Sequence, residues 1–324
     1  MSTFSIVIAT RNRESLLAQT LEALFAQTWP RDQFEIIVAD NGSTDQTAAV
    51  LEAARVRTDG PVVHPLHVPT PGKSHAVNAA VAVSKADFIA YTDDDVRPEP
   101  AWLERLAAAF DETGADFVAG RVLPIWAAPR PAWLSPAVYG VLAVPENGDY
   151  RVEISKGGRQ DIMPIGANMA VRRRVIERLE GLRSDLGKLE GSLRGAEDHE
   201  FFLRMLHSGF RGVYEPTAVV HHWVPTGRLS RAYFRRWFFQ NGKDVARLEP
   251  AFPSAWTRLL GLPRYLWREA ASDSASLVAA TVRRNAAERF RAAARLLWFS
   301  GYLVESWGAP MRLRGRASDR SQAG

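Results

Sequence analysis

The stretch Phe88-Ile89-Ala90-Tyr91-Thr92-Asp93-Asp94-Asp95 decides the fold prediction, because an apolar run of strand length leads directly into three adjacent carboxylates. Like charges held side by side repel, and each raises the pKa of its neighbours unless a cation or hydrogen-bond donor compensates it. A hard divalent metal ion is one such cation, since it takes oxygen ligands and leaves positions open for phosphate oxygens. The alternative is a solvated acidic turn, and the surrounding sequence has to decide between the two.

Short apolar runs alternate with segments of helical pattern over the first 120 residues. The runs are Ile6–Ala9, Phe34–Ala39, Val62–His67 and Phe88–Tyr91, and the helical segments are Ser15–Ala26, Thr47–Val56, Ser74–Ser84 and Trp102–Asp111. This order predicts an α/β fold with a Rossmann-like, mainly parallel sheet and helices on both faces. Ligands of such sheets bind beyond the carboxyl ends of the strands, where this chain carries Thr10–Asn12, Asp40 and Asp93–Asp95.

Periodicity lapses between Arg121 and Pro164, where six prolines with interleaved tryptophan and tyrosine predict a long irregular loop. Regular pattern resumes at Gly166–Met169, followed by a helix over Glu197–His207 and a strand around Val219. Acidic residues at the start of that helix are stabilised by its dipole, which should keep Asp198 ionised. For Glu197 alone, a structural capping role is the simpler interpretation.

Several residue patterns exclude or weaken other classes of protein. Cysteine is absent, which excludes disulfides, thiolate metal sites and cysteine nucleophiles. The loop Thr10–Glu14 has no glycine, so a dinucleotide-binding oxidoreductase is not expected. Pro71-Gly72-Lys73-Ser74 lacks the upstream glycine of a P-loop, although Lys73 can still pair with a diphosphate as a point charge. His221 and His222 point to opposite faces of a strand, so one of them faces the acidic site as a ligand or is an ordinary hydrogen-bonded histidine.

Charge divides the chain into an acidic and a basic part. Residues 1–225 carry 23 Lys and Arg against 29 Asp and Glu, whereas residues 226–324 carry 18 against 7. In the basic part arginines alternate with aromatic residues, which suits an anionic membrane surface. The alternative is a set of helices docked on the catalytic part with a solvated arginine face. Nucleic-acid binding is not expected, because no nucleic-acid module accompanies the pattern.

The ends of the chain give three further expectations. The N-terminal run has no basic region in front of it, so no signal peptide is expected. The longest late apolar run, Leu296–Val304, is too short to span a bilayer. Residues 312–324 are expected to be disordered.

Six stretches taken in order resemble the inverting glycosyltransferases of family two, which have the GT-A fold. They are SIVIATRNR (5–13), DNGSTDQT (40–47), PGKSHAVNAA (71–80), YTDDDVRPEPAWL (91–103), GANMAVRR (166–173) and GAEDHEFFLRMLHSGF (195–210). The resemblance implies a GT-A catalytic domain over residues 1–225, with a nucleotide-binding half over about 1–120 and an acceptor half over about 121–225. A basic, aromatic-rich helical extension over residues 226–324 would follow it.

The resemblance also implies a role for individual residues. It assigns nucleoside binding to Thr10, Arg11, Asn12 and Asp40, diphosphate contact to Lys73, and ribose or donor-sugar contact to Asp94. It assigns a divalent metal, Mg²⁺ or Mn²⁺, to Asp95 and Asp93, with His221 or His222 as a candidate further ligand. It places Gly166, Ala167 and Asn168 on the donor-sugar and acceptor side, and makes Asp198 the general base with Glu197 beside it.

The expected function is inverting transfer of a sugar from a nucleotide-diphosphate sugar to a hydroxyl acceptor, with metal-assisted departure of the diphosphate. The expected acceptor is a lipid-linked or cell-surface polysaccharide precursor at the cytoplasmic face of the membrane. Arg235-Arg236-Trp237 lacks the glutamine of the processive synthases' motif, which favours addition of a single sugar. The alternative is a catalytically inactive nucleotide-sugar or glycan-binding scaffold at the membrane, against which the intact Asp95 and Asp198 argue.

Overall fold

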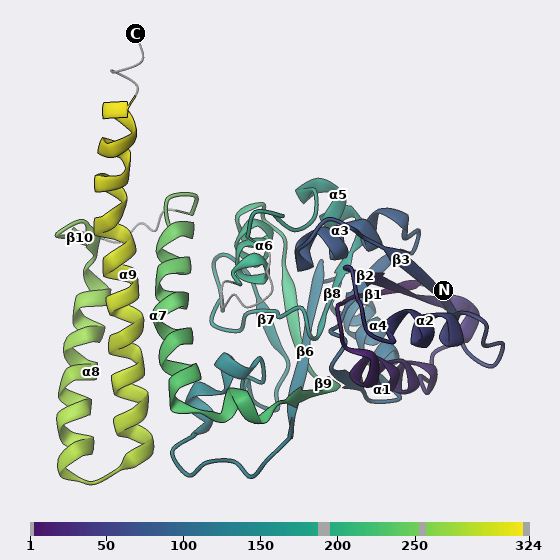
Figure 1. Cartoon of the computed structure of the whole chain (residues 1–324), viewed down its shortest axis with the longest axis horizontal. Helices are drawn as coiled ribbons and strands as arrows, with labels where there is room; N and C mark the ends of the chain where they lie inside the picture. The colour runs from purple at the N-terminus through teal and green to yellow at the C-terminus, as the bar shows by residue number, and fades with distance from the viewer. Residues whose placement is uncertain (1–2, 187–194, 253–256, 320–324) are drawn as a thin grey trace. The chain divides into compact units, whose positions relative to one another are not determined.

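The computed structural model describes residues 3–186, 195–252 and 257–319, with side chains described up to residue 308. As far as it is described, the chain forms two compact units (Figure 1). Of the described residues, the first unit comprises 3–127, 142–186 and 197–224, and the second comprises 128–141, 195–196, 225–252 and 257–319.

The first half of the first unit is a parallel α/β sheet, as the sequence predicts. Its strands are β1 (Phe4–Thr10), β2 (Phe34–Asp40), β3 (Val62–His67) and β4 (Phe88–Tyr91), in the order β3-β2-β1-β4. The intervening helices are α1 (Glu14–Phe25), η1 (Arg31–Gln33), α2 (Thr47–Arg55) and α3 (Lys73–Val83). Val7, Ile37 and Ile89 pack with α3 on one face, while α1 and α4 (Trp102–Thr113) lie on the other (Figure 1). The expected fold class is confirmed for this half of the sheet.

Antiparallel strands enter the sheet in its second half. The elements are β5 (Val96–Pro98), β6 (Phe117–Trp126), η2 (Pro136–Leu142), β7 (Val152–Ile154), β8 (Met169–Arg172), α5 (Arg173–Leu179), α6 (Glu197–His207) and β9 (Gly212–Val224). Strand β8 runs antiparallel between β4 and β6, and β9 lies parallel to β6. Strands β5 and β7 pair antiparallel with β9, so the complete sheet is mixed.

The irregular loop expected from Arg121 onward begins later than the sequence suggests, because β6 continues to Trp126. A register shift between Gly120 and Arg121 marks a bulge, and beyond it β6 is paired with β9 alone, whereas its first residues also pair with β8. Pro124 therefore lies where its missing N–H faces no second neighbouring strand. The proline in the sequence therefore does not predict where this strand ends, because its effect depends on which strands lie beside it.

The side chain of Asn168 holds the junction between β6, β8 and β9. It is fully buried, its Nδ2 donates to Arg121 O and Ala218 O at 2.8 Å each, and its Oδ1 accepts from Trp102 Nε1 at 2.8 Å. Gly120 makes room for this amide, since a Cβ there would lie 2.3 Å from Asn168 Nδ2 and 2.5 Å from Ala218 O. The backbone around the bulge is therefore fixed by one amide side chain.

We expect Gly120→Ala to lower the free energy of unfolding by about 1–3 kcal/mol, because the added methyl group displaces a fully bonded buried amide. Urea denaturation followed by circular dichroism measures the change. Gly157→Ala is the matched control, since a Cβ at Gly157 meets no atom within 4 Å. Equal stability of the two variants would contradict the role assigned to Asn168.

The second unit is built on three helices, α7 (Arg231–Leu248), α8 (Arg264–Val282) and α9 (Ala286–Asp319), with a short turn η3 (Thr226–Leu229) and a hairpin of β10 (Arg258–Leu259) and β11 (Leu262–Pro263). Helix α7 crosses α9 at Gly242 and Gly301. A Cβ at either glycine would lie 2.0 Å from a backbone carbonyl oxygen of the other helix, so glycine is what lets these two backbones touch.

Residues 128–141 belong to this second unit rather than to the first. Trp133 packs against Phe234 and Phe290 with ring centroids 5.3 and 4.4 Å apart, and Arg231 lies over its ring. Part of the proline-rich segment is thus an aromatic anchor on the C-terminal helices. Helix α9 is described as far as Asp319, and residues 320–324 of the segment expected to be disordered lie outside the described residues.

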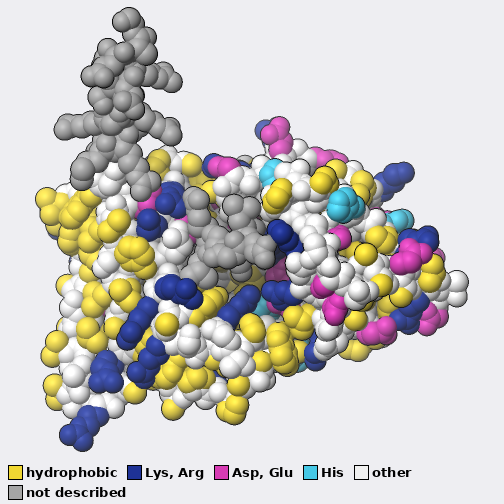
Figure 2. Space-filling model, in the orientation of Figure 1, with side chains coloured by type: hydrophobic (Ala, Val, Ile, Leu, Met, Phe, Trp, Pro, Cys, Tyr) yellow, Lys and Arg dark blue, Asp and Glu magenta, His cyan; other side chains and the backbone are white. Residues whose placement is uncertain are grey.

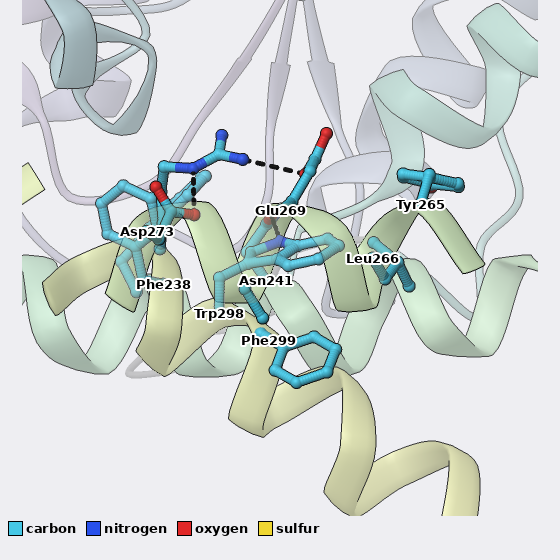
Figure 3. A pocket seen from close by; sticks show the side chains of 11 residues that line it. Phe238, Asn241, Tyr265, Leu266, Glu269, Asp273, Trp298 and Phe299 are labelled. Atoms are coloured by element: carbon cyan, nitrogen blue, oxygen red, sulfur yellow. Dashed lines mark hydrogen bonds and ion pairs between the residues drawn. The ribbon is translucent and has the colours of Figure 1, made fainter. Parts of the chain in front are cut away.

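Lys and Arg side chains lie over much of the face of the second unit that Figure 2 shows. A cavity of about 290 Å³ lies among α7, α8 and α9. Arg295 donates there to Asp273 at 2.7 Å and to Glu269 at 2.9 Å, and Trp298 Nε1 donates to Asn241 at 2.9 Å. Figure 3 shows Glu269, Asp273, Trp298 and Asn241 around this cavity. The polar groups around the cavity are thus largely paired with one another. Within the described residues, no helix combines the length and apolar character needed to cross a bilayer.

Candidate active site

Polar residues after β1, β2 and β4 meet at one edge of the sheet. Thr10 and Asp40 are register partners at the carboxyl ends of β1 and β2, and Thr10 Oγ1 donates a hydrogen bond to Asp94 Oδ2 at 2.8 Å. Thr20 on α1 donates to the backbone oxygen of Asp94 at 3.0 Å. The expectation that these strand ends form one site is supported by this geometry.

Each carboxylate of the acidic triplet has its own partner. Lys73 Nζ lies 2.6 Å from Asp93 Oδ1, and Arg13 Nη1 lies 2.8 Å from Asp95 Oδ2. Asp94 is bonded by the Thr10 hydroxyl, as described, and Arg13 approaches it at 3.9 Å. Two cations and one hydroxyl therefore offset the repulsion among three neighbouring carboxylates.

Burial and neighbouring charge shift two pKa values at this site. Burial, reinforced by the charge of Asp95, raises the pKa of Asp94 to about 7, although Arg13 and Thr10 act in the opposite direction. Burial alone would lower the pKa of Lys73, but Asp93, Asp198 and Glu197 outweigh it and raise that pKa well above its usual range. Lys73 therefore stays protonated. It interacts electrostatically both with Asp93 of the acidic triplet and with Glu197 and Asp198 at the start of α6.

Three side chains of the site can hold a metal ion. Asp93, Asp95 and His222 each offer a ligand atom, and these atoms all lie within 4.8 Å of one another. His222 is buried, with Nε2 3.4 Å from Asp95 Oδ1, whereas His221 lies on the exposed face with Nε2 3.1 Å from Glu99 Oε1. The structure thus places His222, and not His221, with the carboxylates. Two carboxylate oxygens and one imidazole nitrogen fit a divalent first-row metal ion.

The residues expected around the nucleoside lie in two loops that are bonded together. Asn12 has a left-handed backbone with φ of 52°, and its Oδ1 accepts from Thr44 N at 2.7 Å. Asp40 Oδ1 accepts from Ser43 N at 2.9 Å, which is the turn role that its sequence context indicates. Arg11 is exposed at the tip of its loop. The two loops therefore form one rigid rim beside the acidic triplet.

Asn41 and Arg13 are site residues to which the sequence analysis assigned no role. Asn41 Oδ1 accepts from Gly72 N at 2.8 Å, and its Nδ2 donates to Val68 O and Thr70 O at 2.9 and 2.7 Å. Gly72 has φ of 127°, which a residue with a side chain rarely adopts. This bonding aims Lys73 at the carboxylates. Both residues lie within the quoted motifs, but only their three-dimensional contacts reveal what they hold.

Asp198 lies in the first turn of α6 and is positioned by Gly166. The Gly166 N–H donates to Asp198 Oδ2 at 2.9 Å, and a Cβ on Gly166 would lie 3.1 Å from Asp198 Oδ1. Ala167 is buried and its carbonyl accepts from Thr92 Oγ1 at 3.1 Å. Of the three residues expected on the acceptor side, Asn168 is fully buried, and its amide is bonded to Trp102 and to backbone oxygens.

We expect Lys73→Met to lower the free energy of unfolding by about 1–3 kcal/mol, because it leaves Asp93 without its cation in a partly buried cluster. Added Mn²⁺ should then raise the melting temperature of this variant more than that of the wild type, since the ion replaces the lost positive charge. Thermal melts with and without Mn²⁺ measure both effects. Arg183→Met is the control, because it removes only an exposed ion pair with Asp185.

The mixed sheet and the acidic site at its edge define a GT-A class transferase, and the comparisons with known proteins agree. The profile described as Glycosyl transferase family 2 matches residues 5–180. The succinoglycan biosynthesis protein ExoM of Rhizobium meliloti is 30% identical over 237 residues, which is 73% of this chain and 72% of ExoM. Glycosyltransferase AglE of Haloferax volcanii is 30% identical over 118 residues, 36% of this chain and 38% of AglE. The chain belongs to glycosyl transferase family 2.

Solved structures give the same fold at lower identity. The mannosyltransferase PcManGT from Pyrobaculum calidifontis, in complex with GDP-Man and Mn²⁺, has a TM-score of 0.63 at 20% identity, covering 95% of this chain and 88% of that one. S. aureus TarS 1–349 in complex with UDP has a TM-score of 0.55 at 17% identity, covering 94% and 92%. These matches confirm the expected GT-A fold with a C-terminal helical extension.

Proposed function

We propose that this glycosyltransferase moves a sugar from a nucleotide-diphosphate sugar to a hydroxyl acceptor with inversion at the anomeric carbon. The observation that carries the proposal is the electrostatic position of Lys73, which is bonded to Asp93 and influenced by Asp198 and Glu197. A cation that is bonded to Asp93 and feels the charges of Asp198 and Glu197 supports a site in which the diphosphate departs close to the group that takes up the acceptor proton. Inversion follows from a single displacement with a carboxylate base, because no nucleophile for a covalent intermediate is needed.

The donor is held by the rim beside the acidic triplet. Thr10, Arg11, Asn12 and Asp40 bind the nucleoside in this proposal, Asp94 contacts the ribose or donor sugar, and Lys73 contacts the diphosphate. The ties between Asn12 and Thr44 and between Asp40 and Ser43 support this assignment, because loops fixed before binding lose less conformational entropy when the ligand arrives. PcManGT and TarS, whose fold this chain shares, are described with bound GDP-Man and UDP respectively.

Asp93, Asp95 and His222 hold the metal ion in this proposal. The imidazole nitrogen of His222 favours Mn²⁺ over Mg²⁺, because Mg²⁺ prefers an all-oxygen environment. When bound, the ion stabilises the negative charge of the departing diphosphate. Lys73 and Arg13 supply positive charge on the protein side of the same carboxylates.

Asp198 is the general base, with Glu197 beside it. The N–H of Gly166 bonds one carboxylate oxygen of Asp198, which fixes the orientation of the other toward the acceptor hydroxyl. The helix dipole of α6 and the charge of Lys73 keep the carboxylate ionised and ready to accept a proton. Gly166, Ala167 and Asn168 thereby define the acceptor side through backbone position.

The acceptor is a lipid-linked or cell-surface polysaccharide precursor, reached at the membrane surface. The name of ExoM, which refers to succinoglycan biosynthesis, supports this substrate class. Residues 1–120 form the nucleotide-binding half and residues 121–225 the acceptor half in this proposal, and the basic helices after residue 225 serve the membrane. The net positive charge of residues 226–324 is the observation behind that last assignment.

A nucleoside diphosphate should raise the melting temperature in the presence of Mn²⁺, because a ligand that binds only the folded state stabilises it. The screen compares GDP, UDP and their diphospho-sugars on the wild type and on Asp95→Asn. We expect a metal-dependent rise that identifies the base and that Asp95→Asn loses. A folded sample without any rise would contradict the transferase proposal and favour the scaffold.

Replacing Asp198 by Asn should lower kcat by about 10²–10⁴-fold, because it removes the proton acceptor without changing the shape of the site. The metal-dependent rise with nucleotide should remain, which separates loss of chemistry from loss of donor binding. Asp161→Asn, at an exposed ion pair with Arg159, is the control. Proton NMR of the product checks the anomeric configuration, and retention would contradict the single displacement.

A further inference from the structure

The hairpin β10–β11 in the second unit exposes two leucines at its tip. Its turn residues Leu260 and Gly261 have φ of 51° and 81°, the left-handed pair of a type I′ turn. Asn-Gly is the sequence that such turns favour, because a branched apolar residue is strained in the left-handed region. Leu260 is nevertheless 68% exposed and Leu259 49% exposed. Neither the backbone geometry nor core packing explains a leucine at this position.

Two tryptophans hold the hairpin through hydrogen bonds to its backbone. Trp267 Nε1 on α8 donates to Leu259 O at 3.0 Å, and Trp307 Nε1 on α9 donates to Leu260 O at 3.3 Å. The two indole rings lie with centroids 6.3 Å apart. Their polar N–H groups are thus bonded within the protein, while the ring of Trp307 remains 49% exposed. These hydrogen bonds fix the backbone that carries the two exposed leucines.

Positive charge follows the hairpin directly in the chain, where α8 begins. Arg264 and Arg268 are one turn apart at the start of α8 and both are exposed, and within the described residues neither forms an ion pair with an acidic side chain. Arg258 differs, since it is bonded to Glu249. The sequence adds Arg312, Arg314 and Arg316 in the last turns of α9, although their side chains are not described. Cations of this kind beside exposed leucine and tryptophan match an anionic lipid surface.

We propose that the hairpin Arg258–Pro263, with Trp307, inserts Leu259 and Leu260 into the interface of an anionic bilayer while Arg264 and Arg268 contact lipid headgroups. Figure 2 shows hydrophobic side chains gathered at the edge of the second unit where Figure 1 places β10. A second copy of the chain fits less well, because a stable dimer needs about 800 Å² per partner and this apolar tip is only a few side chains wide. The inference rests on the proposed membrane-linked acceptor but not on the transfer chemistry.

Vesicle flotation of the full chain tests this proposal, using phosphatidylcholine vesicles with and without phosphatidylglycerol. Leu260→Asn should lower partitioning onto the anionic vesicles about tenfold, because one leucine no longer enters the interface. Its melting temperature should be unchanged or higher, since Asn suits the left-handed turn position. Reduced binding in an equally stable protein separates membrane contact from a folding defect.

Two further variants sharpen the test. Val282→Asn removes an apolar side chain that is 78% exposed at the other end of α8, and it should bind vesicles as the wild type does. Arg264→Gln with Arg268→Gln should weaken binding to anionic vesicles and leave binding to neutral ones unchanged.

Wild-type binding by Leu260→Asn would overturn the proposal, as would a concentration-dependent dimer that Leu260→Asn abolishes. Absence of vesicle binding by the unmodified chain would also overturn it. If the metal-dependent nucleotide shift persists in that sample, the failure concerns the membrane inference alone and the transferase proposal stands.

Discussion

Three adjacent carboxylates after β4 are held by two cations, a hydroxyl and an imidazole, and each of these groups comes from a different segment. Arg13 precedes α1, Lys73 begins α3, Thr10 ends β1 and His222 belongs to β9. The triplet can be buried only if all four segments arrive together, because an uncompensated buried carboxylate is strongly unfavourable. The contacts that compensate the buried carboxylates are therefore the same contacts that bring these four segments of the first unit together. A bound cation would relieve the remaining negative charge, so Asp93, Asp95 and His222 can hold a metal ion.

The change from parallel to antiparallel pairing brings Gly166–Asn168 close to the acidic triplet. A purely parallel sheet would continue past β4 with another crossover helix, whereas β8 enters antiparallel and carries Gly166–Asn168 to the edge where the acidic triplet lies. Asn168 then fixes β6 and β9 around the bulge at Gly120, and its bond from Trp102 ties this junction to α4. Asp198 is aimed by the backbone that this buried amide supports. The acidic triplet and Asp198 are therefore coupled through buried packing within the sheet.

Periodicity suffices to predict the parallel half of the sheet because each strand and helix there is a local pattern, and the strand ends then follow from the direction of the chain. The same logic places Thr10, Asp40 and the acidic triplet at one edge from the sequence alone. Periodicity does not predict which segments that are distant in the sequence come into contact. Period two separates His221 from His222 but cannot say which of them faces inward, since that is set by pairing with β5 and β6. Pro124 is misleading for a related reason: whether a proline ends a strand depends on its neighbours in the sheet.

For the basic residues 226–324, composition alone overestimates how many arginines are available at the surface. Several of its arginines form ion pairs inside the second unit, where Arg247 pairs with Glu305, Arg291 with Glu288, and Arg295 with Asp273. Part of the alternation of arginine and aromatic residues is thus the pattern of three helices that pack through glycine crossings and ion pairs. A more specific signal lies at the hairpin, where Arg264 and Arg268, two of the arginines without an acidic partner in the described part of the chain, follow an apolar turn whose backbone geometry does not favour leucine. A leucine that is both strained and exposed adds no core packing to the isolated fold, and this favours an explanation in what the turn touches.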